Sequence, residues 1–290
     1  MNILLVYTLS SFAKNNSGGN PAGVVIAQNQ LTLQQMQRTA KEVGFSETVF
    51  IQESSKADYR ARFFTPSSEV DLCGHATIAA FSLMTGLGII DKGKYTMETM
   101  AGVLDVEVHN DNRVFMNQTL PEYFDFVPSS EIADCLGISE CNISSALPVQ
   151  IVSTGLRDIM VPIDCLKTLL DIKPDMSKIV ELSIKYHVIG VHAFSMETMN
   201  NSTAHCRNFA PLYDIPEESA TGTSNGALAC YLWKHKLISL DQTYGLVFEQ
   251  GYSLNNPSEI VAKLEINGDS ISAVKIGGIA VLTGKLEISD

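Results

Sequence analysis

The chain has 290 residues, of which 45% are hydrophobic and 18% are charged, and its formal net charge is −12. This size and composition are ordinary for a globular protein with one large or two medium domains. The acidic balance argues against nucleic acid or an anionic membrane as a partner. The six cysteines show no C-x-x-C spacing and no partnering histidine cluster. We therefore expect no metal site, reduced thiols and a cytoplasmic location.

The first 52 residues read as a strand, a Gly-rich loop, a strand, a helix and a strand. The apolar start lacks the basic region and cleavage site of a signal peptide, so it is interpreted as the first strand. Thr32 and Gln35 form a capping box for the helix, and Gly44 ends it. Helical spacing turns Leu33, Met36, Ala40 and Val43 inward. The predicted strands are 3–8, 22–27 and 48–52, and the predicted helix is 33–43.

Glu47 lies at the start of the third strand, within the run F-S-E-T-V-F-I. Alternation places Glu47 on the same face as Phe45, Val49 and Ile51, where a carboxylate would be suited to proton transfer. The alternative is that Phe50 faces the core and Glu47 faces solvent. Both faces carry apolar residues, so spacing alone leaves the two alternatives open.

A motif R-x-F-x-P follows at 62–66, then Glu69 and the turn Cys73-Gly74-His75. The turn opens the stretch 72–90, which has no Asp, Glu, Lys or Arg and is long enough to suggest a membrane span. A helix that is apolar on all sides can equally form the core of a soluble domain. We favour the buried helix, because a shorter second copy occupies the same relative place.

That second copy follows the same element order, with strands at 149–152, 159–163 and 188–194 and a helix at 175–186. It repeats R-x-F-x-P at 207–211, then Glu217, Glu218 and a turn around Gly222 that opens uncharged sequence up to Trp233. A repeat period above 100 residues indicates two similar domains. We place the boundary near 120–130, giving domains 1–120 and 130–290. Whether the final strand returns to the first domain is left open.

Each turn would expose backbone N–H groups at a helix start, which suits a carboxylate or phosphate. The two turns suggest a pseudo-twofold molecule that binds one anionic ligand between its halves. His75 at the first helix start is a candidate proton shuttle, although a lone His is more often structural. Glu218 before the second start could simply be a capping acid. Thr221 lies opposite Cys73 in the alignment, so the thiol pair of a two-cysteine racemase is missing.

The loop G-G-N-P-A-G at 18–23 is not a dinucleotide fingerprint, because no G-x-G-x-x-G leads from a strand into a helix. It could be a tight turn, or it could bring the Asn20 amide to the ligand. The sequence also lacks a phosphate-binding loop and a serine-nucleophile motif. Nucleotide hydrolysis and serine acyl transfer therefore find no support in the sequence.

Four strings together resemble the phenazine-biosynthesis PhzF-like isomerase family, a branch of the diaminopimelate epimerase fold. They are G-N-P-A-G-V at 19–24, F-S-E-T-V-F at 45–50, V-D-L-C-G-H-A-T at 70–77 and R-x-F-A-P…E-E-S-A-T-G-T at 207–223. The resemblance implies an α+β protein of two similar pseudo-twofold domains, each a curved sheet around a central buried helix. It also implies a biosynthetic role, a cytoplasmic homodimer, no metal and no cofactor.

The resemblance assigns general acid/base catalysis to Glu47 and substrate binding or orientation to Gly74 and His75. The family's second motif usually reads E-D-P-A-T-G-S-A, so the usual Asp, Pro and Ser are here Glu218, Ser219 and Thr223. A carboxyl and a hydroxyl group remain, but their reach changes, and the substrate identity does not carry over.

The resulting hypothesis is an isomerase that moves a proton within a small carboxylic acid. Its catalytic residues are Glu47, His75 and Glu218, and its substrate-binding residues are Asn20, Gly74, Gly222 and Thr223. The first alternative is an amino-acid-type epimerase that uses Glu47 and a second acid/base such as His75. The other is a non-catalytic protein that binds a small acid. Fold alone does not separate these possibilities.

Overall fold

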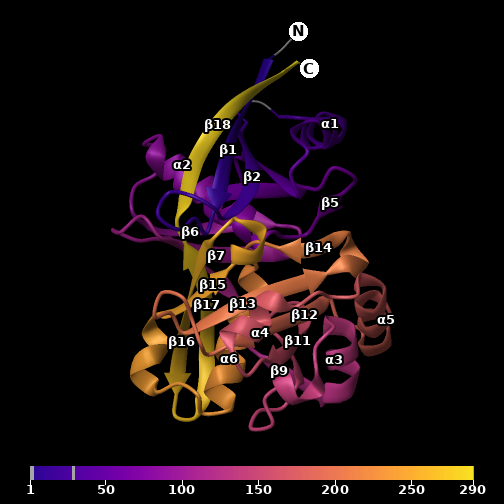
Figure 1. Cartoon of the computed structure of the whole chain (residues 1–290). Coiled ribbons are helices and arrows are strands. Elements are labelled where there is room, and N and C mark those ends of the chain that lie inside the picture. Colours follow the sequence, from indigo (N-terminus) through magenta and orange to yellow (C-terminus); the bar gives the residue numbers. More distant parts are fainter. Residues whose placement is uncertain (1–2, 28–29, 290) are drawn as a thin grey trace. The chain divides into compact units, whose positions relative to one another are not determined.

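The computed structural model describes residues 3–27 and 30–289. The chain forms two compact units (Figure 1). Unit 1 comprises Met1–Asn117 and Gly277–Asp290, and unit 2 comprises Gln118–Ile276. The last strand therefore belongs with the first part of the chain.

Unit 1 is a mixed sheet with two helices. Its last strand, yellow in Figure 1, lies beside its first strand, in indigo, and pairs with it in antiparallel fashion. The elements are β1 (Ile3–Ser11), β2 (Asn20–Ile26), α1 (Leu33–Val43), β3 (Glu47–Gln52), β4 (Tyr59–Phe64), β5 (Glu69–Val70), α2 (Gly74–Gly86), β6 (Gly93–Thr99), β7 (Gly102–Val108), β8 (Val114–Gln118) and β18 (Ala280–Ser289).

Unit 2 has the same character with more short helices. Its elements are β9 (Glu122–Phe126), α3 (Ser129–Leu136), η1 (Glu140–Asn142), β10 (Gln150–Ser153), β11 (Arg157–Pro162), α4 (Leu166–Asp171), α5 (Met176–Tyr186), β12 (Gly190–Ser195), β13 (Ala204–Ala210), η2 (Pro211–Tyr213), β14 (Ile215–Glu218), α6 (Gly222–Lys234), η3 (Leu240–Tyr244), β15 (Leu246–Gln250), η4 (Tyr252–Leu254), β16 (Ser258–Asn267) and β17 (Ser270–Gly278).

The two units share one strand order. In unit 1 the neighbours run β18-β1-β2-β3-β4-β6-β7, and in unit 2 they run β9-β10-β11-β12-β13-β15-β16. The parallel pairs also agree, since β2–β3 and β4–β6 correspond to β11–β12 and β13–β15. The duplication inferred from the motifs is thus present in the sheet topology.

Each unit buries one helix against its sheet. In unit 1, α2 packs on β1, β2, β3 and β18, and its residues from His75 to Phe81 are all buried. In unit 2, α6 packs on β10, β11 and β16, and its residues from Ser224 to Leu232 are all buried. Burial on every face explains why both helices lack charge in their middle turns.

The membrane alternative for the stretch 72–90 finds no support in helix length. The helix α2 ends at Gly86 and has 13 residues. No helix within the described parts of the chain combines the length and the apolar character needed to cross a membrane.

The cap signals of α1 are confirmed. Thr32 accepts a hydrogen bond from the Gln35 backbone, the Gln35 side chain returns to the Thr32 backbone, and Gly44 adopts a left-handed conformation with φ 72°. Met36 and Ala40 are fully buried, as expected. Leu33 differs: it is 56% exposed, because the first helical residue lies at the end of the buried face.

The arginine of each R-x-F-x-P motif forms an ion pair that holds a neighbouring segment in place. Arg62 makes a two-pronged ion pair with Glu69 at 2.7 Å, and Arg207 makes the same pair with Glu217 at 2.8 Å. Each glutamate lies four residues before the residue that caps its central helix. The arginine on one strand therefore fixes the segment that leads into α2 or α6.

Candidate active site

The start of α2 carries the first group of candidate residues. Cys73 is the N-cap residue in an extended conformation, and its side chain makes no capping hydrogen bond to the described helix. The Thr77 hydroxyl donates to the Cys73 carbonyl at 2.8 Å, and the Ser11 hydroxyl donates to the His75 carbonyl at 2.6 Å. The backbone N–H groups of the first turn, including Gly74, therefore lie on a fixed framework.

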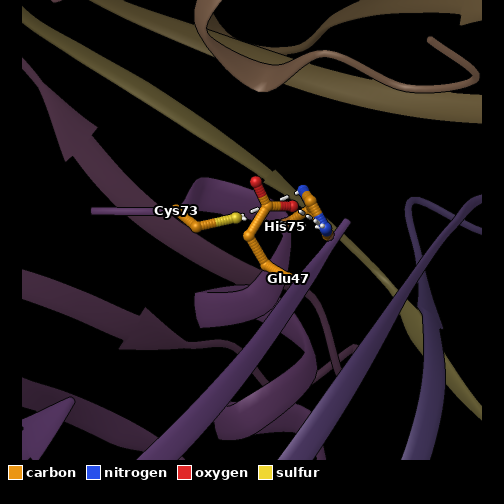
Figure 2. A group of neighbouring side chains, drawn as sticks. All are labelled: Glu47, Cys73 and His75. Carbon is orange, nitrogen blue, oxygen red and sulfur yellow. Dashed lines mark hydrogen bonds and ion pairs between the residues drawn. The ribbon is translucent and has the colours of Figure 1, made fainter. Parts of the chain in front are cut away.

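His75 is the centre of this group. Its Nε2 atom lies 3.3 Å from Oε2 of Glu47 and 3.5 Å from the Ser46 hydroxyl. Its Nδ1 atom lies 3.3 Å from the Cys73 thiol and 3.5 Å from the Asn20 amide nitrogen. Figure 2 shows the Glu47, Cys73 and His75 side chains pointing toward one another. Four sequence-predicted residues of unit 1, namely Asn20, Glu47, Gly74 and His75, therefore meet at one helix start.

Whether Glu47 faces the core or the solvent has an answer that neither alternative anticipated. The four residues that follow it in β3 are all buried, so both faces of this strand are covered. Glu47 is the first residue of the strand and its side chain is 18% exposed. It lies neither in the apolar core nor in open solvent, and its carboxylate contacts His75.

Glu47, Cys73 and His75 also have the atom types of a metal site. One donor atom from each lies within 4.8 Å of the others. A carboxylate, a thiol and an imidazole are zinc ligands in other proteins. The same atoms can carry and relay protons, and His75 already has neighbours on both ring nitrogens.

The start of α6 carries the second group, which belongs to unit 2. Thr221 is the N-cap residue, and its hydroxyl donates to Oε2 of Glu218 at 2.5 Å. The Thr154 hydroxyl lies 2.6 Å from the Gln118 amide oxygen and 3.2 Å from the Thr223 carbonyl oxygen, at the position where Ser11 donates to the His75 carbonyl in unit 1. Asn225 donates to the Thr221 carbonyl at 2.9 Å, as Thr77 does for Cys73.

Gln250 supports this second helix start and was not anticipated from the sequence. Its amide nitrogen donates to the Glu218 carbonyl at 2.8 Å and to the Thr221 hydroxyl at 3.0 Å. Its amide oxygen accepts from the Asn225 side chain at 2.8 Å. Ser11, Ser46 and Thr154 were missed in the same way, because a single hydroxyl or amide in a strand has no distinguishing sequence pattern.

Comparisons with known proteins agree with this architecture. The family model described as phenazine biosynthesis-like protein matches residues 9–285. A Deinococcus radiodurans protein named as an isomerase is 34% identical over 285 residues, covering 94% of this chain and 91% of its own length.

The chain belongs to the phenazine biosynthesis-like (PhzF) family. This is an isomerase family, so the expected enzyme class is confirmed. A trans-2,3-dihydro-3-hydroxyanthranilate isomerase of Pseudomonas aeruginosa is 28% identical, with 93% of this chain and 94% of that protein covered.

Solved structures extend the likeness to the fold. A PhzF-family protein of Bacillus anthracis matches with a TM-score of 0.89 and 28% identity, with both chains covered in full. A hydroxyproline epimerase of Agrobacterium vitis matches with a TM-score of 0.62 at 11% identity, covering 99% of this chain and 92% of the other. This second likeness concerns the fold alone, and it confirms the epimerase-type α+β architecture.

Proposed function

We propose that this PhzF-family protein moves a proton within a small carboxylic acid, with Glu47 as the proton carrier. The observation that supports this most is the 3.3 Å approach of the Glu47 carboxylate to His75 at the start of a buried helix. A positioned carboxylate of this kind is a suitable general acid/base. His75 would orient the substrate and assist the transfer.

In an unsaturated acid, the step would balance without any co-reactant. Glu47 would take a proton from one carbon, and the electron pair of that C–H bond would become part of a new double bond. The neighbouring double bond would open, and the protonated Glu47 would return the proton to the carbon at its far end. The backbone N–H groups at Gly74 and Gly222, together with Asn20 and Thr223, would hold the ligand and stabilise charge that develops in the transition state.

The substrate proposed first is a cyclic acid related to trans-2,3-dihydro-3-hydroxyanthranilate, on which the Pseudomonas relative acts. Glu218, Ser219 and Thr223 stand where the family usually has Asp, Pro and Ser, so the preferred acid can differ from that compound. Glu218 would contribute its carboxylate next to the helix start.

A panel of cyclic, hydroxy and amino carboxylic acids tests the proposal. Each acid would be incubated with the protein in D₂O and followed by proton NMR. Isomerisation predicts a product whose double bond has moved. Chiral chromatography of the same samples detects the epimerase alternative, and binding without any product favours the non-catalytic alternative.

We also propose that the protein acts in the cytoplasm as a homodimer, with a small acid as its partner and with neither metal nor cofactor. Light scattering coupled to size-exclusion chromatography tests the dimer. Activity after exhaustive treatment with a chelator tests the metal-free mechanism.

A further inference from the structure

Four core positions differ in chemistry between the two units. The two units can be aligned residue by residue from their strand pairing. Arg62 and Arg207 are equivalent, and they pair with Phe50 and Ala193, so Phe50 and Ala193 are equivalent as well. In unit 1 the four positions hold apolar residues that are fully buried. In unit 2 they hold polar residues that are equally buried. The pairs are Ala22 and Asp158, Val49 and His192, Phe63 and Asn208, and Ala76 and Ser224.

The four polar residues form one hydrogen-bond chain. The Ser224 hydroxyl donates to Oδ2 of Asp158 at 2.7 Å and accepts from the Asn208 amide at 3.1 Å. The same amide nitrogen lies 3.2 Å from Nδ1 of His192. The chain joins three neighbouring strands, β11, β12 and β13, to the first turn of α6.

A second set of buried contacts, made by Gln250, also holds the start of α6. Gln250 on β15 is fully buried and bonds to Thr221, to Asn225 and to the Glu218 carbonyl. The polar side chains around the start of α6 therefore come from four different strands.

Such a network is not needed to build the fold. Buried polar groups lose their hydration and are often no more stabilising than apolar groups of similar volume. Unit 1 has the same fold with apolar residues at these four positions, and its central helix is equally buried. Two atoms of the network, Oδ1 of Asp158 and Nε2 of His192, have no hydrogen-bond partner within residues 3–27 and 30–289. A role beyond packing would account for its presence.

We propose that Asp158, His192 and Asn208 are positioning residues that fix the first turn of α6 through Ser224. Their effect is to aim the backbone N–H groups of Gly222 and Thr223 at the acid group of the substrate. The inference rests on the proposed function, in which these groups bind that acid.

The charge state of the network agrees with this role. Burial raises the pKa of Asp158 to about 7, and the hydrogen bond from Ser224 opposes the rise. Burial lowers the pKa of His192 to about 3. Near neutrality His192 is uncharged and Asp158 is only partly ionised, so the network carries less than one full negative charge.

The test replaces two residues of the network with the residues that unit 1 has at the equivalent positions. The double variant Asp158→Ala/Ser224→Ala installs the alanines that unit 1 has at these positions. Asp158→Asn is the conservative variant: its amide oxygen can still accept the hydrogen bond from Ser224, so the network should be kept. Ser195→Ala removes another buried hydroxyl of unit 2 and serves as the control.

Two readouts separate positioning from stability. With the best acid of the panel, we expect the double variant to raise KM at least tenfold while kcat changes less than threefold. Without any ligand, we expect hydrogen exchange in residues 221–226 to accelerate at least tenfold, while exchange in the rest of unit 2 stays within twofold. Asp158→Asn and Ser195→Ala should keep KM near the wild-type value and should show no accelerated exchange in residues 221–226.

Unchanged KM and unchanged exchange would overturn the inference, and so would faster exchange spread evenly over unit 2. If the double variant does not fold, Ser224→Ala alone breaks the same chain and the same criteria apply. If the wild-type protein converts and binds none of the acids, the proposed function fails. The exchange readout still decides whether the network positions the α6 turn, so the two failures are distinguishable.

Discussion

Glu47 and Gly190 occupy the same register position in the two units. Glu47 pairs with Ala22 across parallel strands, and Gly190 pairs in the same way with Asp158. A Cβ atom at residue 190 would lie 1.9 Å from the backbone oxygen of Phe209, so no side chain fits there. The carboxylate of unit 1 therefore has no counterpart in unit 2. This asymmetry argues against a pair of equivalent carboxylate bases, one in each unit. The epimerase alternative with His75 as the second acid/base is tested separately, by chiral chromatography.

The first prediction concerns Cys73, whose counterpart in unit 2 is Thr221. Because no thiol pair is available, we expect Cys73→Ser to retain activity within about fivefold, since its hydroxyl can replace the contact with His75. Steady-state kinetics on the wild type and the variant provide the measurement. A loss of several orders of magnitude with intact folding and ligand binding would instead favour thiol-based epimerisation.

Thr223 tests the binding role of the α6 start. Thr223→Val keeps the shape of the side chain and removes the hydroxyl group. Loss of a hydrogen bond to a charged group costs roughly 1.5–3 kcal/mol, so KM should rise about 10- to 100-fold. Thr223→Ser, which restores the family's usual residue, is the matched control and should keep KM near the wild-type value. Equal KM values for the valine and serine variants would remove Thr223 from the binding site.

The two arginine–glutamate ion pairs, one in each unit, allow their contributions to stability to be compared within one chain. Arg207 is 7% exposed and also donates to the carbonyls of Leu169 and Ile172, whereas Arg62 is 18% exposed. A lysine cannot reproduce the two-pronged contact with a carboxylate. We expect Arg207→Lys to lower the free energy of unfolding by roughly 2 kcal/mol and Arg62→Lys by about half as much. Urea denaturation measures both, and a larger effect at Arg62 would contradict this ranking.

Asp158 predicts how stability changes with pH. Its carboxyl keeps its proton up to a pKa of about 7 in the folded protein, while the unfolded chain releases it near pH 4. Between these values the folded state binds more protons, so the contribution of Asp158 to stability falls as pH rises, by about 4 kcal/mol at most. Asp158→Asn removes this loss.

The measurement is the difference in unfolding free energy between Asp158→Asn and the wild type at several pH values. We expect the variant to gain stability relative to the wild type from pH 4 to pH 7 and the difference to level off above pH 8. A constant difference across this range would show that the carboxyl does not titrate there.

Sequence patterns predicted the repeated element order well, because helix caps, strand alternation and the R-x-F-x-P motif are local signals. The short helix α4 was missed, since Leu166–Asp171 is too brief to show helical periodicity. The meeting of Glu47, Cys73 and His75 depends on strand register and on the start of α2. The motif strings named two of these residues as site residues but could not give their distances.

The polar network of unit 2 was beyond prediction for a different reason. Asp158 and His192 stand singly among apolar strand residues, and Asn208 lies inside the R-x-F-x-P motif. Only the pairing of β11, β12 and β13 brings them to Ser224. Their contrast with unit 1 becomes visible once the two units are aligned by register.

The most direct test of the central claim is deuterium exchange by Glu47→Gln. The variant keeps the size of the side chain but cannot accept a proton from carbon, and a general base contributes about 10²–10⁴-fold to rate. The measurement follows both wash-in of deuterium from D₂O at the substrate carbon and product formation, in wild type and variant, with ligand affinity determined in parallel. We expect the wild type to form product, with exchange unless the proton is shielded and returned directly, and Glu47→Gln to bind the acid normally while losing at least 100-fold in both signals. A variant as active as the wild type would contradict the assignment of Glu47 as the proton carrier.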